Sequence, residues 1–299
     1  MSDCHAMGVD AQTALALAVV PYSIEESITE TTLTAMLSGA CDALEADGCQ
    51  LVGGHTCEGA ELALGFSVSG MVNDPDKILR KRGGKIGDKI VLTKPLGTGA
   101  IFASDMRVEC QGVHVAQALS SMMKSNRPAS RVALSFPKHI RACTDVTGFG
   151  LVGHLLEMLV ANDNDGSLPS IGAVIYLDRI PFLEGALEAS SKGIFSSLQD
   201  DNFRSRRAVA NHAEVAAAFP IQYPLIFDPQ TAGGLLFFVS PDVCDEFLSK
   251  LRGESGGYNK AAAIIGEIVE YNAQNEDHAG VCTIGSEGKG TGQRLTIRF

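Results

Sequence analysis

The charged, glycine-rich segment NDPDKILRKRGGKIGD at residues 73–88 is the feature that most limits how this chain can fold. Its composition is typical of a linker, whereas regular apolar patterns occur on both sides of it. The chain has 299 residues, which is enough for two ordinary domains with sizeable cores. We therefore expect a first domain at residues 1–84 and a second at 85–299.

Apolar patterns before this segment predict three strands and a helix, and one of the strands is the short LVGG at 51–54. Residues 14–20 form a short apolar run that predicts a buried strand, which Pro21 ends. Residues 62–72 alternate in a period of two, which predicts a half-buried strand with one face that needs covering. A single apolar stripe between them predicts a helix. The stripe consists of Leu33, Met36, Leu37, Ala40, Cys41 and Leu44.

The second part alternates helical and strand patterns, but not as regular β-α-β units. We therefore expect a mixed α+β fold. Helices are expected at 113–124, 128–135, directly after TDVTGFG, at 182–192 and up to about 251; strands are expected at 89–97, 173–177, 235–240, 261–270 and 294–299.

Composition excludes some classes of protein. The net charge is −11 and the pI about 5.1, which argues against a duplex nucleic acid partner. There is no Trp for base stacking and no apolar run long enough for a membrane span. The eight cysteines form no CxxC pair, and we read them as reduced thiols, typical of the cytoplasm.

Four segments share one pattern: a strand end, then glycines and a short polar residue. They are SDCHAMG (2–8), GGHT (53–56), TDVTGFG (144–150) and DPQTAGG (228–234). Glycines let the backbone approach phosphate oxygens, and aspartates favour a hard cation. The segments therefore predict a Mg²⁺–nucleotide or phosphate site made of separate loops, with Asp3, Asp145 and Asp228 as possible cation ligands.

Each segment also has a purely structural interpretation. An aspartate before a glycine turn is usually an Asx-turn, and Asp145 could simply cap the following helix. GGHT alone reads as a tight turn, and Asp228 as a structural residue. His154 is expected to be a half-buried helix residue with its hydrogen bonds satisfied, so His55 is the better functional histidine. The sequence contains no P-loop, no zinc spacing and no GxSxG motif.

The order of the motifs resembles the selenophosphate synthetase (selenide, water dikinase) family. The resemblance rests on SDCHAMG, LVGGHT, LTKPLGTG, TDVTGFGLVGHLLEM and DPQTAGGLL, and spans nearly the whole chain. SD-AMG and GG-T are shared with wider relatives, namely aminoimidazole ribonucleotide synthetase, thiamine-monophosphate kinase and a hydrogenase maturation factor. GGHT, with its histidine, resembles the form that this motif has in the selenophosphate branch.

The resemblance implies a two-domain fold and an activity. The N-terminal α/β domain would dimerise through a β-barrel, and the C-terminal domain would be α+β, so a homodimer is expected. ATP, selenide and water would give selenophosphate, AMP and phosphate. Asp3 and Asp145 match aspartates that hold Mg²⁺ at the ATP phosphates, and Gly54, His55 and Thr56 match a segment that contacts the nucleotide.

One departure concerns the start of the chain. The resemblance implies a catalytic cysteine or selenocysteine and a lysine in a segment before SD-AMG, which would lie upstream of Met1. We expect an incomplete N-terminal domain and an inactive chain as written: a fragment, one piece of a larger polypeptide, or a degenerate paralogue. Cys4 is not expected to replace the missing nucleophile.

Two other functions stay open on the sequence. The first is another ATP-dependent small-molecule kinase or ligase of the same superfamily, which would release ADP in place of AMP. The second is a non-catalytic subunit that binds nucleotide or dimerises with a full-length partner.

Overall fold

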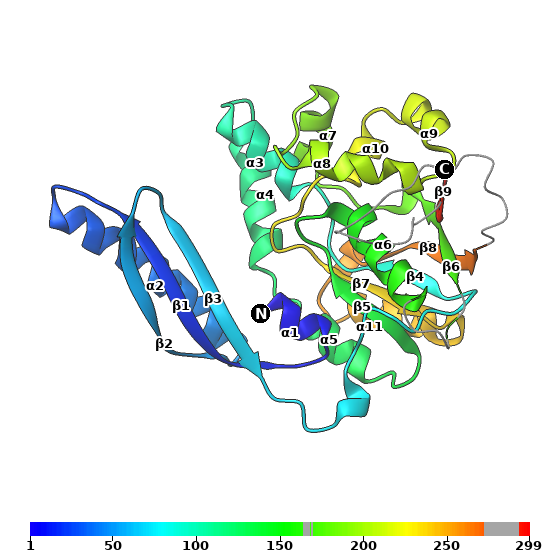
Figure 1. Ribbon diagram of the computed structural model, residues 1–299, viewed down its shortest axis with the longest axis horizontal. Coiled ribbons are helices and arrows are strands. Elements are labelled where there is room, and N and C mark those ends of the chain that lie inside the picture. The colour runs from blue at the N-terminus through cyan, green and yellow to red at the C-terminus, as the bar shows by residue number, and fades with distance from the viewer. Residues whose placement is uncertain (164–167, 169, 272–292) are drawn as a thin grey trace. The chain divides into compact units, whose positions relative to one another are not determined.

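The computed structural model describes residues 1–163, 168, 170–271 and 293–299. The chain divides into two compact units, Met1–Ile78 and Leu79–Phe299 (Figure 1). The fold is mixed α and β with two separate sheets, as the sequence predicted. Among the described residues, no helix combines the length and the apolar character needed to span a bilayer.

The first unit is a three-stranded sheet with one long helix. The strand order is β2-β1-β3, with β2 parallel and β3 antiparallel to the central strand. Helix α2 makes the connection between β1 and β2 and packs on both of them. The elements are α1 (Ser2–Ala6), β1 (Ala11–Pro21), α2 (Glu26–Ala46), β2 (Gln50–Gly59), β3 (Ala63–Gly70) and a short 3-10 turn, η1 (Pro75–Lys77).

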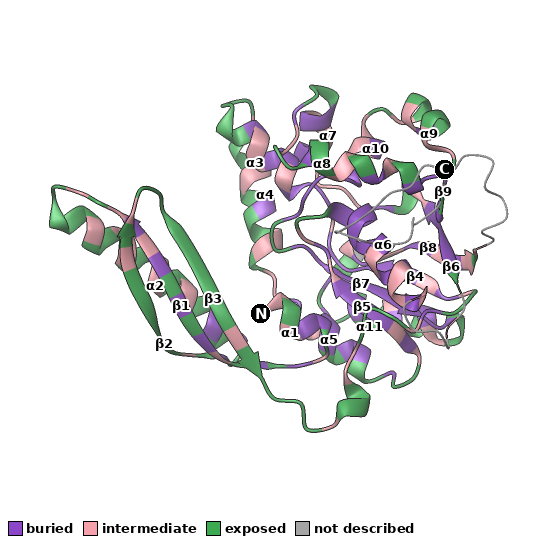
Figure 2. Cartoon of the chain, viewed as in Figure 1, coloured by how far each residue is buried: buried purple, intermediate pink, exposed green. Residues whose placement is uncertain are grey.

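Burial in this sheet follows the two faces of the central strand. From Ala14 to Val20 every second residue of β1 is buried, and Ala14 and Leu44 of α2 belong to one apolar cluster. Leu15 and Leu17 point to the other face and are 48% and 51% exposed. The half-buried face expected for 62–72 is wrong, since β3 is exposed over almost its whole length (Figure 2).

Two local predictions in this unit are also wrong. SDCHAMG is not a loop, because Ser2–Ala6 form helix α1 and the turn begins only at Met7. GGHT is not a tight turn, because Gln50–Gly59 pair with β1 in continuous parallel register from Leu15 onward. SDCHAMG was expected to be a loop, and GGHT alone a turn, because glycines often end helices and strands. In GGHT, pairing with β1 decides the conformation instead.

The second unit is built on a six-stranded sheet of order β5-β7-β4-β8-β6-β9. All neighbours are antiparallel except β6 and β9, which run parallel. The strands are β4 (Lys89–Leu92), β5 (Ile140–Asp145), β6 (Ile171–Tyr176), β7 (Leu235–Val239), β8 (Ala263–Glu270) and β9 (Leu295–Arg298).

Helices pack on this sheet and beside it. The longer ones are α3 (Thr98–Met106), α4 (Gly112–Met123), α5 (Arg127–Leu134), α6 (Gly150–Asp163), α7 (Glu184–Ser191) and α11 (Cys244–Arg252). The shorter ones are η2 (Leu177–Arg179), α8 (Gln199–Asn202), η3 (Phe203–Ala208), α9 (His212–Ala218), α10 (Gln222–Leu225), η4 (Pro241–Val243) and η5 (Asn259–Ala261). The sequence predicted α4, α5, α6, α7 and α11 but not α3 or the short helices of 199–225.

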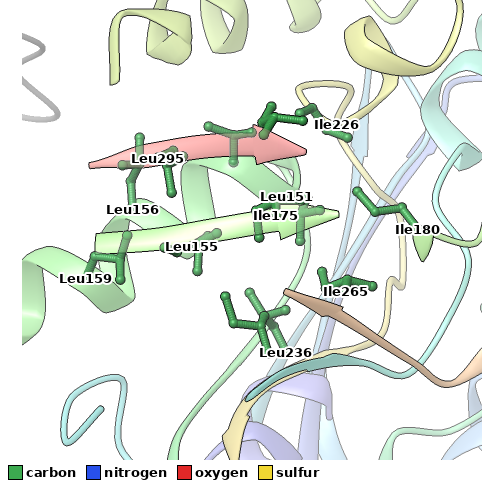
Figure 3. Close-up of a cluster of buried hydrophobic side chains, with 14 of the residues drawn as sticks. Leu151, Leu155, Leu156, Leu159, Ile175, Ile180, Ile226, Leu236, Ile265 and Leu295 are labelled. Carbon is green, nitrogen blue, oxygen red and sulfur yellow. The ribbon is translucent and has the colours of Figure 1, made fainter. Parts of the chain in front are cut away.

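The core of the second unit lies between α6 and the sheet. Leu151, Leu155 and Leu159 of α6 face apolar side chains of the strands, among them Ile175 and Leu236 (Figure 3). All five residues of β7 are buried, because the sheet is covered on both faces. On the face away from α6, the ring of Phe237 stacks edge-on against Phe247 of α11, with 5.3 Å between centroids.

Candidate functional site

The motifs TDVTGFG and DPQTAGG lie against each other in the second unit. Strands β5 and β7 pair up to Asp145 and Leu235, so the loops after β5 and before β7 meet. The amide of Val146 donates to the Gly234 carbonyl at 2.9 Å, and the amide of Gln230 donates to the Thr147 carbonyl at 3.0 Å. A side chain at Gly233 would place its Cβ 2.1 Å from the Val146 carbonyl oxygen, so this contact requires glycine.

Asp145 and Thr147 are two of the oxygen-bearing side chains at this junction. Asp145 ends β5 and Thr147 follows two residues later, and both are half-buried. Val146 between them is fully buried in the core. The junction thus presents a carboxylate and a hydroxyl beside loops rich in backbone amides.

A chain of polar contacts leads from Thr147 into α6. The Thr147 hydroxyl lies 3.2 Å from Nε2 of His154, and Nδ1 of His154 lies 3.1 Å from Oε2 of Glu157. Lys81 donates to the same carboxylate oxygen at 2.9 Å. The hydrogen bond from His154, followed by the Lys81 contact, lowers the pKa of Glu157. His154 is thus a helix residue with both ring nitrogens engaged, as the sequence predicted, although it is buried and not half-buried.

Asp228 has a structural role. Its carboxylate is fully buried and accepts the backbone amides of Ala100 at 2.7 Å and Ser196 at 3.2 Å. Burial raises its pKa to about 7. The Asp228 oxygens are committed to these amides, which argues against the cation role considered for this residue and supports the structural one.

Gln230 holds the glycine turn of LTKPLGTG in place. Its side-chain oxygen accepts the Gly97 amide at 2.8 Å, and its side-chain nitrogen donates to the Asp228 carbonyl at 2.9 Å. The Thr231 amide donates to the Thr98 hydroxyl at 2.9 Å. DPQTAGG therefore connects β7, α3 and the loop after β5.

Two lysines beside these loops were missed from the sequence. Lys94 is only 3% exposed, and its ammonium donates to the carbonyls of Lys124 and Ala232. Lys124 donates to the Gly257 carbonyl and lies 4.0 Å from the ring centroid of Tyr258. Burial lowers the pKa of Lys124. The available signal was the lysine of KPLG directly after a buried strand, which is an unusual place for a charge.

The other predicted site residues lie in the first unit. Asp3 is exposed in the first turn of α1, which is anchored by buried His5, with Nε2 3.8 Å from Oδ2 of Asp47. Gly54, His55 and Thr56 are consecutive and exposed in β2. Of the five predicted residues, Asp145 alone belongs to the second unit.

The predicted carboxylates, each taken within its own unit, can be compared with the ligands that Mg²⁺ uses. The described residues contain no group of three or more His, Cys, Asp or Glu side chains that could hold a metal. Mg²⁺ is usually bound by one or two carboxylates together with waters and substrate phosphates. The half-buried Asp145 carboxylate and the exposed Asp3 carboxylate are donors of this type.

Seven of the cysteines lie in the described part of the chain, and all are free thiols. Burial raises the pKa values of Cys143 and Cys244, that of Cys244 to about 11. Burial is also the main cause of the raised pKa of Cys4. A thiol with a raised pKa is a poor nucleophile, in agreement with the minor role expected for Cys4. Cys282 lies outside the described residues.

Comparisons with known proteins place these motifs in a family. Residues 1–72 match the model of the AIR synthase related protein N-terminal domain, and residues 85–276 match the C-terminal domain of the same family. Solved structures with a similar fold include E. coli HypE, a hydrogenase maturation protein, with a TM-score of 0.64, 17% identity, and coverage of 90% of this chain and 71% of that one. The thiamine-monophosphate kinase of Stenotrophomonas maltophilia K279a has a TM-score of 0.61 at 16% identity, covering 99% of this chain and 74% of that one.

Curated relatives are more similar in sequence. The selenide, water dikinase of Pelobacter propionicus is 34% identical over 90% of this chain and 72% of its own length. That of Campylobacter jejuni strain RM1221 is 37% identical over 93% of this chain and 74% of its own length. At this identity and coverage, the chain belongs to the selenide, water dikinase family, within the AIR synthase related proteins.

Proposed function

We propose that this protein takes part in the synthesis of selenophosphate from ATP, selenide and water, with release of AMP and phosphate. The observation that carries the proposal is the 34% to 37% identity to selenide, water dikinases over at least 90% of the chain. The packing of TDVTGFG on DPQTAGG supports it, because these are the motifs most specific to the resemblance.

Under this proposal Asp3 and Asp145 hold Mg²⁺, and Gly54, His55 and Thr56 contact the nucleotide. Mg²⁺ would neutralise charge on the ATP phosphates, which is the main requirement of phosphoryl transfer. The residues of this chain then act by position: Asp145 is fixed by the β5–β7 pairing, and Asp3 by the buried His5 of its helix.

We also propose that the protein forms a homodimer through the sheet of the first unit. Leu15 and Leu17 are half exposed on a face that the unit itself leaves open. Strands β2 and β3 form the two edges of this sheet, and exposed edges and apolar faces favour pairing with another chain.

Product analysis tests the reaction. The protein is incubated with Mg²⁺, ATP and selenide under anaerobic conditions and followed by ³¹P NMR. AMP, phosphate and a selenophosphate signal in equal amounts are expected once the cysteine- or selenocysteine-bearing segment implied by the resemblance is present. ADP in place of AMP would point to another kinase. ATP binding without turnover, with or without that segment, would favour a non-catalytic subunit.

A substitution tests the metal assignment. Asp145→Asn removes the carboxylate charge, so Mg²⁺-dependent ATP binding in calorimetry should weaken by about tenfold or more. The matched control is Asp201→Asn in the same unit, whose side chain is 68% exposed and pairs with Arg204. Unchanged binding in Asp145→Asn would contradict the assignment.

A further inference from the structure

The peptide of Thr147 is fixed in position by the loops around it. Its carbonyl accepts the amides of Gln230 and Gly150, both at 3.0 Å. The neighbouring Gly148 carbonyl accepts the side-chain nitrogen of Asn202 at 2.8 Å. With the backbone held on both sides, the remaining freedom of Thr147 is the orientation of its hydroxyl.

His154 sets that orientation. Residues 154 and 157 are three apart on α6, so their side chains lie on one face of the helix. The Glu157 carboxylate, which also pairs with Lys81, lies 3.1 Å from Nδ1 of His154 and can accept its proton. In the tautomer with the proton on Nδ1, Nε2 accepts the Thr147 hydroxyl at 3.2 Å.

The surroundings keep the His154 ring in this position. Its side chain is only 7% exposed, and the Phe149 ring packs on it with 5.4 Å between centroids. A histidine whose two nitrogens are both engaged and whose ring is covered has little rotational freedom. The Thr147 hydroxyl proton is thus directed inward, which leaves the lone pairs of the oxygen available elsewhere.

Thr147 lies two residues after Asp145, and both side chains are partly accessible. Val146 has no exposed surface and belongs to the core, whereas Asp145 and Thr147 are both half-buried. Asp145 is the last residue of β5, so the carboxylate and the hydroxyl leave the chain two residues apart, on either side of the buried Val146.

We propose that His154 is a positioning residue that orients Thr147, so that the Thr147 oxygen assists Asp145 in holding hydrated Mg²⁺. The inference rests on the proposed function, because it takes Asp145 as a Mg²⁺ ligand. It adds two residues to that site: Thr147 as an oxygen donor, and His154, held by Glu157 and Lys81, as the group that directs it.

Paired variants test this inference. Thr147→Val removes the oxygen, and His154→Asn keeps an amide near Glu157 but does not reach Thr147. His154→Gln places an amide oxygen near the Nε2 position, and Thr147→Ser keeps the hydroxyl. Mg²⁺-dependent ATP binding is measured by calorimetry on the whole 299-residue chain, with Mg²⁺ as the titrated probe.

Thr147→Val and His154→Asn should each weaken apparent Mg²⁺ affinity by about fivefold to tenfold, the size of one lost hydrogen bond. The double variant should be no weaker than either single one, because the two act as one unit. His154→Gln and Thr147→Ser should stay within about twofold of the original. His114→Asn, a half-buried histidine of α4 that contacts Glu188, is the control for a general effect.

The outcomes separate this inference from the proposed function. If Asp145→Asn abolishes Mg²⁺-dependent binding and Thr147→Val does not change it, only the inference is wrong. Additive losses, or a His154→Asn variant that unfolds more easily but binds Mg²⁺ normally, would also overturn it. If the unmodified chain shows no Mg²⁺-dependent binding, the metal assignment and the inference both fail.

Discussion

Gly54 illustrates how a residue in a functional motif can have a structural cause. It sits inside β2, where a Cβ would lie 2.0 Å from the Ala16 carbonyl oxygen of the neighbouring strand. Its φ of 156° is also rare for other residues. The glycine is required by the close approach of β1 and β2, whatever the strand binds.

Gly54→Ala should therefore destabilise the first unit by on the order of 3 kcal/mol, because the strands must separate to admit the methyl group. Urea unfolding followed by circular dichroism measures the loss. Gly65→Ala in β3 is the matched control, since nothing lies within 4 Å of its added Cβ. Equal effects of the two substitutions would contradict this explanation.

Asp228 predicts a pH dependence of stability. Its pKa is about 7 in the folded chain, against about 4 for an unfolded aspartate. The favourable contribution of the neutral carboxyl is complete below pH 4 and is lost as the pH rises through 7, by up to about 4 kcal/mol. The free energy of unfolding of the second unit should therefore fall across this range.

Asp228→Asn isolates this contribution. The amide cannot titrate, so the difference in unfolding free energy from the original chain should change between pH 4.5 and pH 8. Its NH₂ group also cannot accept the second of the two backbone amides, so the variant should be less stable at acid pH. A difference independent of pH would contradict the assigned pKa.

The elements predicted correctly are those with long patterns. Helix α2 has its less exposed side along the predicted stripe, from Leu33 to Leu44. Helix α6 was found from the apolar spacing after TDVTGFG, and it is the helix on which the core is built. Such patterns can be recognised in the sequence because every residue of the stripe packs against the sheet and is therefore apolar.

The elements that were missed are short or lack a distinct pattern. Helices α8, α9 and α10 have only four to seven residues, too few for a stripe to repeat. At the site, His154 was located correctly on a helix, whereas the strand that ends at Asp145 was not among the expected strands. The contact of His154 with Thr147, and the buried Lys94, depend on packing between distant segments, which spacing along the chain does not reveal.

Leu155 tests the importance of α6. It is fully buried between α6 and the sheet, so Leu155→Ala should cost about 3 kcal/mol of unfolding free energy. Leu119→Ala is the control, because Leu119 of α4 is a helical leucine that is 46% exposed. A comparable loss in both variants, measured by thermal or urea unfolding, would mean that α6 does not form the core described here.

At the scale of the whole molecule, the two units differ in how well they bury their residues. The sheet of the second unit is covered on both faces, whereas that of the first has an open face with Leu15 and Leu17. The family match spans both units, with residues 1–72 in the first and 85–276 in the second. The proposed homodimer assigns the open face to a second copy.

Leu17→Lys should then shift the protein from dimer to monomer in size-exclusion chromatography with light scattering, because a charge would be buried in the interface. Met106→Lys is the control, since Met106 is 86% exposed in the second unit. A Leu17→Lys protein that keeps the mass of a dimer would place the interface elsewhere.

The strand order of the second unit has a consequence for synthesis on the ribosome. Its central strand β4 begins at Lys89 but pairs with Val239 of β7 and Glu267 of β8, which are translated much later. The three strands of the first unit, by contrast, all lie between Ala11 and Gly70. At about 5–20 residues per second, β4 emerges several seconds or more before its partners. Chaperones that bind nascent apolar segments should therefore contact Ile90 and Val91 until translation is nearly complete.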